Sequence, residues 1–397
     1  MRQMFKVPLI LNLTALLAVI WIIVPAPGYQ IWLFSVAVSE WSLWFAALAL
    51  LGIIAGLFSR TVNGQGNLWL LSSVIGSLAF IISLYPFFSV LSIAREQNIS
   101  LSLKTYFNGI WKESNSSAKE LKDFTTYTYA HADGEGLQLD VYLPTVNAAN
   151  GASVIVVHEG SWNGGARSDF PQWNRWLATQ GYTVFDVDYR LAPQPNYLTA
   201  TGDVKCAVRW VKSHAAEFKI SPERISLLGR SAGAHLALLS AYSAGDARLP
   251  ATCAEENVTN ENVRAVVSFY APTDLPWAYD NPANRLVIDG PATLSRFLGG
   301  SPHESDEIRE RFIFASPTAH VTSDTPPTLL IHGGQDQLVR SENMMRLAGK
   351  LKEANATHKT LFIPYAQHGF DYNFNGWGAQ IVQSEILGFL HENIQTR

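Results

Sequence analysis

The chain divides into an apolar first part and a second part in which charged and apolar residues mix. From Pro8 to Ala94 the ionisable side chains are Tyr29, Glu40, Arg60 and Tyr85, and almost all other charges follow residue 94. This contrast predicts a lipid-facing part. It is followed by a water-soluble domain of about 270–300 residues, which is long enough to bury a core of its own.

Three apolar runs in the first part have about the length of membrane-spanning helices. They are Pro8–Val24, Trp41–Phe58 and Leu68–Ala94. The second is the end of a longer run that Glu40 interrupts. A signal peptide is the alternative for the first run, which follows two basic residues. Because further apolar runs come after it, we expect three spans.

Basic residues near the spans set the expected orientation, since loops rich in Lys and Arg stay in the cytoplasm. Arg2 and Lys6 precede the first span and Arg60 lies between the second and third, whereas the loop between the first two has neither Lys nor Arg. Three spans from a cytoplasmic start put residue 95 onward outside. We expect a multi-pass membrane protein with an anchor at 1–94, a linker at 95–123 and an extracytoplasmic domain at 124–397.

Strand and helix patterns alternate along this domain. Alternating polarity predicts a hairpin from Phe124–Ala130 and Leu137–Leu143. Short runs rich in β-branched residues predict buried strands, and a period of 3.6 residues predicts helices. The strands are expected at 152–157, 182–187, 225–229, 263–270, 327–332 and 360–364, and the helices at 200–218, 232–242, 343–354 and 379–392. The alternation indicates an α/β fold with a mostly parallel sheet and helices on both faces.

An irregular segment with four prolines, residues 275–315, interrupts this order. It is a candidate lid, and a surface excursion without a role is the alternative. The net charge of −4 and the lack of a Lys/Arg-rich run argue against a nucleic-acid partner. Cys206 and Cys253 are not in a metal-ligand spacing. Two buried thiols and one disulfide both remain open, and the disulfide would require an oxidising compartment.

The sequence GRSAG at residues 229–233 fits the pattern G-x-S-x-G, between a predicted strand and a predicted helix. A serine at such a sharp turn is exposed for attack, and small neighbours avoid steric clashes. The helix N-terminus directs free N–H groups toward a reacting carbonyl oxygen. We therefore predict that Ser231 is a nucleophile.

A serine nucleophile needs a base, and the base needs a group that fixes its tautomer. Asp336 follows the predicted strand 327–332, and His368 follows 360–364. Since parallel strands end at one edge of a sheet, both should lie near Ser231. We expect a triad of Ser231, Asp336 and His368, with Asp274 as the reserve acid. His235 is expected to pack or form hydrogen bonds without a catalytic role.

The developing oxyanion needs N–H donors already in place. The sequence HEGSWNGG at residues 158–165 follows the first central strand. The backbone amides of Gly160 and Ser161, together with that of Ala232, are the candidate donors. Trp162 is a candidate substrate-binding residue.

Several of these segments resemble motifs of the hormone-sensitive-lipase-like esterases and related bacterial esterases. HEGSW at 158–162 resembles the H-G-G-G-W oxyanion loop of that family. DYRLAP at 188–193, SPERI at 221–225, GRSAGAHL at 229–236 and the stretch 326–339 are similar to further motifs. The likeness covers roughly residues 124–395. It implies an α/β-hydrolase fold and a Ser-Asp-His triad, with neither a metal nor a cofactor.

The chain departs from the family pattern next to the predicted catalytic groups. Glu159 and Ser161 stand where the family usually has glycine, and Arg230 replaces an acidic residue before the serine. Because both charged changes fall in one neighbourhood, we hypothesise that Glu159 pairs with Arg230.

These patterns predict a serine hydrolase that cleaves carboxylic esters through an acyl-enzyme on Ser231. Its expected substrate is a small-molecule or lipid-like ester, and membrane lipid surrounds its anchor. An amidase, a peptidase or an acyltransferase could use the same triad. The alternative from another class is a catalytically silent membrane scaffold. The oligomeric state is left open.

Overall fold

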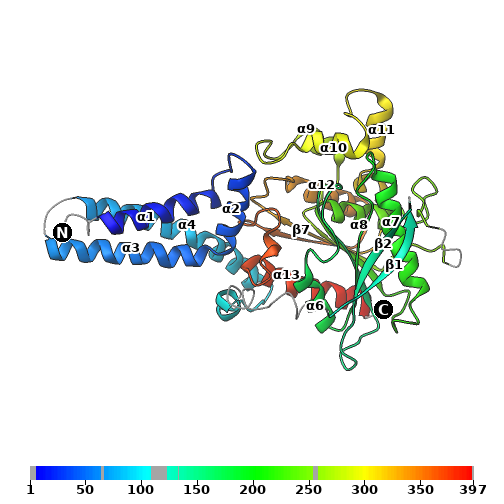
Figure 1. Cartoon of the computed structure of the whole chain (residues 1–397), viewed down its shortest axis with the longest axis horizontal. Helices are drawn as coiled ribbons and strands as arrows, with labels where there is room; N and C mark the ends of the chain where they lie inside the picture. Colours follow the sequence, from blue (N-terminus) through cyan, green and yellow to red (C-terminus); the bar gives the residue numbers. More distant parts are fainter. Residues whose placement is uncertain (1–5, 64–66, 109–122, 133, 254–257, 396–397) are drawn as a thin grey trace.

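In the computed structural model, a narrow helical bundle projects from a larger α/β domain (Figure 1). The structure describes residues 6–63, 67–108, 123–132, 134–253 and 258–395. Arg2 and residues 109–122 of the expected linker lie outside the described residues.

The bundle contains three long apolar helices. They are α1 (Lys6–Val19), which η1 (Ile20–Ile22) extends, α3 (Ser42–Asn63) and α4 (Leu68–Glu96). Two helices are long and apolar enough to cross a membrane, at Ser42–Ser59 and Leu68–Glu96. The first apolar helix, Val7–Ile22, is shorter. The structure thus supplies two of the three expected spans by length and composition, and the third stays a prediction.

A buried polar residue joins the three helices. The side-chain amide of Asn12 on α1 donates two hydrogen bonds to Ser72 on α4. One goes to the Ser72 carbonyl oxygen at 2.8 Å and the other to the Ser72 Oγ at 3.0 Å. Gly52 on α3 and Gly76 on α4 leave the space that this side chain fills. Small residues and interhelical hydrogen bonds are how helices associate in membranes.

A short helix separates the bundle from the α/β domain. The residues directly before Trp41, for which no separate element was predicted, form α2 (Tyr29–Glu40). This helix ends before α3 begins. In Figure 1, α2 lies at the junction of the two parts. Trp32 on α2 and Ala26 pack with Val287 of the α/β domain. The second apolar run is therefore two helices.

The predicted sheet is present, with eight strands among the described residues in the order β1-β2-β4-β3-β5-β6-β7-β8. The expected hairpin forms the antiparallel pair β1 (Thr125–Ala132) and β2 (Glu135–Tyr142), and β2 also pairs antiparallel with β4. The other pairings are parallel. The remaining strands are β3 (Ser153–Val157), β4 (Thr183–Val187), β5 (Ile225–Arg230), β6 (Ala265–Phe269), β7 (Thr328–Gly333) and β8 (His358–Ile363).

Helices cover both faces of the sheet. On one face, α7 (Tyr197–Ser213), α8 (Ala232–Tyr242) and α12 (Glu342–Glu353) contribute to a core with Ile155, Leu227 and Leu330. On the other face, α6 (Pro171–Thr179) and α13 (Trp377–Leu390) pack with Val154, Val156 and Leu228. Alternate residues of each strand thus face opposite cores, which is why β3–β7 are apolar and buried along their length. Short helical turns complete the chain at η2 (Pro317–His320), η3 (Phe370–Tyr372) and η4 (His391–Gln395).

The second core also joins the bundle to the domain. Val90 and Ala94 of α4 belong to it, as does Tyr106. The Tyr106 ring stacks on Trp377 of α13 with centroids 4.3 Å apart. Because these contacts are buried and aromatic, the bundle packs firmly against the sheet layer.

The proline-rich segment is more ordered than expected. It contains α9 (Leu275–Asp280), α10 (Gly290–Leu298) and α11 (Asp306–Phe314), drawn in yellow in Figure 1. Pro276 and Pro291 occupy the first turns of α9 and α10. A proline is tolerated there because the N–H it lacks would have no partner within the helix. These prolines therefore start helices and do not break them.

The two cysteines form a disulfide. Cys206 of α7 is bonded to Cys253, and their Cα atoms are 5.6 Å apart. The structure thus favours the second of the two interpretations that the sequence left open.

Candidate active site

Ser231 occupies the sharp turn between β5 and α8. Its backbone has φ 50° and ψ −117°, a left-handed conformation that non-glycine residues rarely adopt. The Ser231 amide donates to the Phe269 carbonyl oxygen at 3.0 Å, which fixes the turn to β6. A Cβ atom at Gly233 would lie 2.2 Å from the His158 carbonyl oxygen. The helix can start so close to β3 only because this residue is glycine.

Asp336 and His368 come together at the ends of β7 and β8, as their positions predict. His368 Nδ1 lies 2.7 Å from Asp336 Oδ2. Asp336 Oδ1 accepts hydrogen bonds from the amides of Leu338 at 2.8 Å and Val339 at 2.9 Å. Its Oδ2 also lies 3.2 Å from Nε2 of His332. Backbone and imidazole thus hold the carboxylate in one orientation.

The charges in this pair reinforce each other. Although burial disfavours the carboxylate, His368 and His332 hold the pKa of Asp336 well below its usual range. Burial also disfavours a charged imidazole. The Asp336 carboxylate outweighs this effect and raises the pKa of His368 above its ordinary value of about 6.5. The pair is therefore suited to stabilise a proton on His368.

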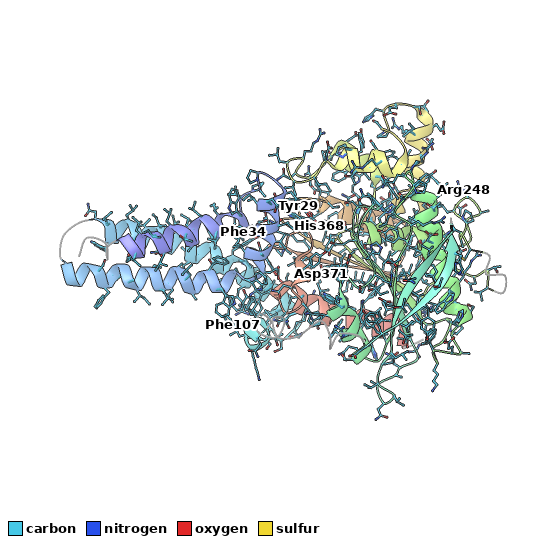
Figure 2. All side chains as sticks on the ribbon, viewed as in Figure 1. Tyr29, Phe34, Phe107, Arg248, His368 and Asp371 are labelled. Carbon is cyan, nitrogen blue, oxygen red and sulfur yellow. A yellow bond between two sulfur atoms is a disulfide. The ribbon has the colours of Figure 1, made fainter. Side chains whose placement is uncertain are left out.

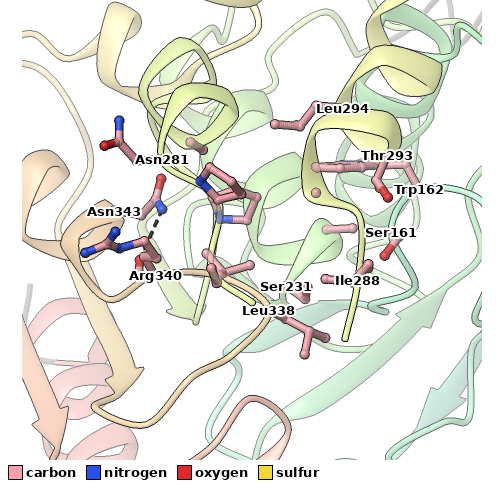
Figure 3. A pocket seen from close by; sticks show the side chains of 17 residues that line it. Ser161, Trp162, Ser231, Asn281, Ile288, Thr293, Leu294, Leu338, Arg340 and Asn343 are labelled. Carbon is pink, nitrogen blue, oxygen red and sulfur yellow. Dashed lines mark hydrogen bonds between the residues drawn. The ribbon is translucent and has the colours of Figure 1, made fainter. Parts of the chain in front are cut away.

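Ser231 and His368 line the same cavity, which has a volume of about 520 Å³. Glu159, Gly160 and Ser161 of the loop after β3 also line it. A second, smaller cavity of about 70 Å³ begins at Ser231 and contains Ala232 and Trp162 in its wall (Figure 3). All the residues predicted to act on substrate therefore border one of two cavities that meet at Ser231.

The loop after β3 leaves the backbone amides of Gly160 and Ser161 without an acceptor among the described residues. Gly160 has φ 119° and Ser161 has φ 54°. A Cβ atom at Gly160 would lie 2.1 Å from the Gly164 carbonyl oxygen, so glycine is required there. Within the part of the chain that the structure describes, the amides of Gly160 and Ser161 donate no hydrogen bond. The Ala232 amide belongs to the first turn of α8, where backbone donors lack intrahelical acceptors.

Trp162 shapes the smaller cavity and is itself fixed. Its ring stacks on Phe297 of α10 with centroids 4.2 Å apart, and its Nε1 donates to His235 Nδ1 at 3.2 Å. His235 Nε2 then donates to the Ala315 carbonyl oxygen at 2.8 Å. Burial lowers the pKa of His235 to about 4, so its ring is neutral at physiological pH. His235 is thus a packing and hydrogen-bonding residue, as expected.

The hypothesised pairing of Glu159 with Arg230 is wrong. Arg230 Nε donates to Asp371 Oδ2 at 2.6 Å, and both side chains are buried. The guanidinium also lies over the ring of Phe170, 4.0 Å from its centroid. Sequence reasoning missed Asp371, although it stands only three residues after His368. An arginine in an apolar strand-end turn was the signal that a buried carboxylate must lie nearby.

Glu159 is bound by tyrosines. The Tyr372 hydroxyl donates to Glu159 Oε1 at 2.8 Å. The Tyr270 hydroxyl donates to Asp371 Oδ1 at 2.6 Å and lies 3.5 Å from Glu159 Oε2. Burial raises the pKa of Glu159 above its usual value. The two charged departures from the family pattern, Glu159 and Arg230, are thus linked through Tyr270 and Asp371.

The remaining candidates have structural positions. Asp274 accepts a hydrogen bond from the Trp277 amide at the start of α9, and its Oδ2 lies 2.6 Å from Nη2 of Arg346. It is therefore a helix cap and not the acid beside His368. Among the described residues, no group of three or more His, Cys, Asp or Glu side chains could share a metal ion.

Removing one partner of the Arg230–Asp371 pair should destabilise the fold strongly. We expect Asp371→Asn to lower the free energy of unfolding by about 3–5 kcal/mol, because it leaves a buried guanidinium without its counter-charge. The double variant Arg230→Met/Asp371→Leu should recover most of this loss, since neither side chain of the pair then carries a charge. Denaturant unfolding of the full chain in detergent measures both. Equal stability of Asp371→Asn and wild type would contradict the pairing.

Comparison with known proteins places this arrangement among esterases. The BD-FAE family model matches residues 139–351, more than half of the chain. "Probable carboxylic ester hydrolase LipM" of Mycobacterium tuberculosis is 25% identical over 86% of this chain and 81% of its own length. That match must extend into the first 123 residues, because residues 124–397 make up less of the chain. "Esterase LipC" of the same organism is 30% identical over 61% of this chain, which spans only 59% of that protein.

Solved structures agree on the fold. The propionate-bound esterase Est2 of Thermogutta terrifontis superposes with a TM-score of 0.54 and 25% identity, over 68% of this chain and 95% of that one. A truncated carbohydrate esterase from gut microbiota has a TM-score of 0.57, over 68% and 97% of the two chains. The α/β domain has the α/β-hydrolase fold, and the chain belongs to the BD-FAE family.

Proposed function

We propose that the chain hydrolyses carboxylic esters through an acyl-enzyme on Ser231. His368 acts as the base and Asp336 orients it. The observation that carries the proposal is the 2.7 Å contact between His368 Nδ1 and Asp336 Oδ2, in a ring that lines the same cavity as Ser231. With Nδ1 engaged by the carboxylate, Nε2 is the nitrogen left to accept the serine proton.

The reaction has two halves. Ser231 Oγ attacks the ester carbonyl carbon while His368 Nε2 takes its proton, and the oxyanion rests on the amides of Gly160, Ser161 and Ala232. The imidazolium then returns the proton to the alcohol oxygen as the C–O bond breaks. Water adds to the acyl group through the same base, and the acid leaves with Ser231 restored.

The reaction class is supported by the named relatives. The chain is a carboxylic ester hydrolase: LipM and LipC bear carboxylic ester hydrolase and esterase names, and the solved neighbours are esterases. Because the motifs alone fit several leaving groups, the ester preference rests on these relatives, and a small-molecule ester is the substrate class they share.

The proposal includes attachment to a membrane through the helical bundle, with three crossings. In Figure 1, α1 begins and α3 ends at the far end of the bundle, so the start of α1 and the α/β domain lie at opposite ends. Most of the large apolar side chains exposed to solvent belong to the first 94 residues. The Cys206–Cys253 disulfide favours an extracytoplasmic location for the hydrolase domain.

Ester hydrolysis should fall on acidification. His368 must be neutral to accept a proton, and its pKa is raised, so the loss should begin above pH 6.5 and reach about tenfold per pH unit. The pH profile of kcat/KM on a p-nitrophenyl ester measures it. Asp336→Asn should cut kcat by about 10³–10⁴-fold and move the acid limb to lower pH. A rate that does not change between about pH 5 and pH 8 would contradict the role of His368.

Hydrolysis of p-nitrophenyl esters should depend wholly on Ser231. We expect Ser231→Ala to reduce turnover to background, a loss of about 10⁶-fold in kcat. The exposed serine Ser92, on α4, offers a matched control: Ser92→Ala should retain full activity. Parallel assays with the corresponding anilides should give far slower rates. Anilide cleavage faster than ester cleavage would refute the ester assignment while leaving the nucleophile in place.

A further inference from the structure

Ser231 lies where two cavities of unequal size meet. The smaller cavity, of about 70 Å³, has residues of α9 and α10 in its wall, among them Ala278 and Leu294 (Figure 3). The larger, of about 520 Å³, extends toward the bundle. Ser161, Ser231, Ile288 and Leu338 border both. An ester has two substituents, so each cavity can hold one of them.

One wall of the larger cavity comes from α2. Trp32, Leu33, Val36 and Ala37 of this helix line it opposite His368 and Tyr372. That wall is therefore mainly apolar, although Glu40 lies at its end. The α/β domain alone would leave the cavity open on this side.

Hydrogen bonds fix α2 to the loop that carries Asp336. The Ala26 amide, in the turn before α2, donates to Gln337 Oε1 at 2.7 Å. Asn284 Nδ2 donates to the Ala26 carbonyl oxygen at 2.6 Å and to Gln337 Oε1 at 2.9 Å. Leu338 packs against the cluster formed by Ala26 and Trp32. These contacts hold α2 in a fixed position beside the site.

The outer side of α2 is apolar and exposed. Tyr29 is 50% exposed, and Leu33 and Phe34 are each 42% exposed (Figure 2). Since Tyr29 and Leu33 also line the larger cavity, the mouth of that cavity lies at this apolar surface. A helix whose exposed side is apolar, at the end of an apolar helical bundle, is suited to contact the bilayer. The larger cavity therefore opens toward lipid.

The position of the base assigns the two substituents. His368 must give its proton to the leaving alcohol oxygen, so the alcohol has to lie on the side of His368. His368 lines the larger cavity and is not in the wall of the smaller one. Of the candidate oxyanion donors, Ala232 borders only the smaller cavity, Gly160 only the larger one, and Ser161 both, so the oxyanion lies between the two cavities. The acyl chain therefore enters the smaller cavity.

The volumes set the size of each group. At roughly 10–15 Å³ for each water-sized site, a cavity of about 70 Å³ holds about five to seven heavy atoms. A short acyl group of about two to five carbons fits this space, and the larger cavity has several times its capacity. Resting on the proposed esterase function, we infer that the physiological substrate is a short-chain ester of a large apolar alcohol, drawn from the membrane along α2.

Two matched ester series test the inference with the full chain in detergent. One varies the acyl group on ethanol from acetyl to hexadecanoyl, and the other varies the alcohol of acetate esters from ethyl to hexadecyl. We expect kcat/KM to rise at least about tenfold along the alcohol series, as apolar pockets discriminate by size. It should fall by a similar factor beyond about five acyl carbons. The opposite order, with Ser231-dependent hydrolysis, overturns the inference but not the esterase function.

Variants of α2 test its part in the site. Ala37→Trp, which fills the larger cavity, should lower the ratio of kcat/KM for hexadecyl acetate over ethyl acetate at least about tenfold. Phe34→Trp, on the same helix but outside the cavity wall, should leave the ratio unchanged. Equal ratios in Ala37→Trp and wild type would overturn the role of α2. If the folded wild-type protein hydrolysed none of these esters, the proposed function would be overturned as well.

The route of the substrate has its own measurement. The enzyme is reconstituted into phosphatidylcholine vesicles, and hexadecyl acetate is added either to the same vesicles or to separate ones. We expect hydrolysis at least about tenfold faster in the first case, because burial of its sixteen-carbon chain holds the ester in its own bilayer. Equal rates, under conditions where the ester does not exchange, would overturn delivery from the membrane.

Discussion

The buried ion pair between Arg230 and Asp371 is the constraint on which the geometry of the site depends. Arg230 directly precedes Ser231, and Asp371 lies in the loop of His368, so one contact of 2.6 Å ties the two loops together. Tyr270 joins Asp371 to the vicinity of Glu159, which directly precedes Gly160. A buried charge pair is costly to separate, and its directional bonds favour one arrangement. These contacts therefore hold the loops of the nucleophile, the base and the oxyanion donors in fixed positions relative to one another.

Much of this arrangement could be predicted from local patterns. Buried parallel strands are apolar and β-branched, so β3 to β7 were recognisable, and functional groups gather where parallel strands end. Asp336 and His368 follow from that rule. The Arg230–Asp371 contact joins residues 141 positions apart, and no local pattern encodes which carboxylate an arginine meets. For the same reason α2 was missed, because its apolar residues resemble a span until the α/β domain is present to bury Trp32.

The bundle side of the molecule and the hydrolase domain both contribute residues to the cavity at Ser231. On one side of Ser231, residues of α9 and α10 form part of the wall of the smaller cavity. The other side is covered by α2, which belongs to the bundle. Docking through Ala26 and Gln337, and through Tyr106 and Trp377, keeps this wall in place. The bundle thus contributes to the shape of the site.

The central claim is that Ser231 is the acylated residue, and labelling with a fluorophosphonate tests it most directly. A fluorophosphonate reacts with a serine whose proton is taken by a neighbouring base. After digestion, mass spectrometry should find the adduct on the peptide that contains Ser231, and His368→Ala should abolish it. A folded, ester-hydrolysing chain that carried the adduct at another residue, or none at all, would contradict the account.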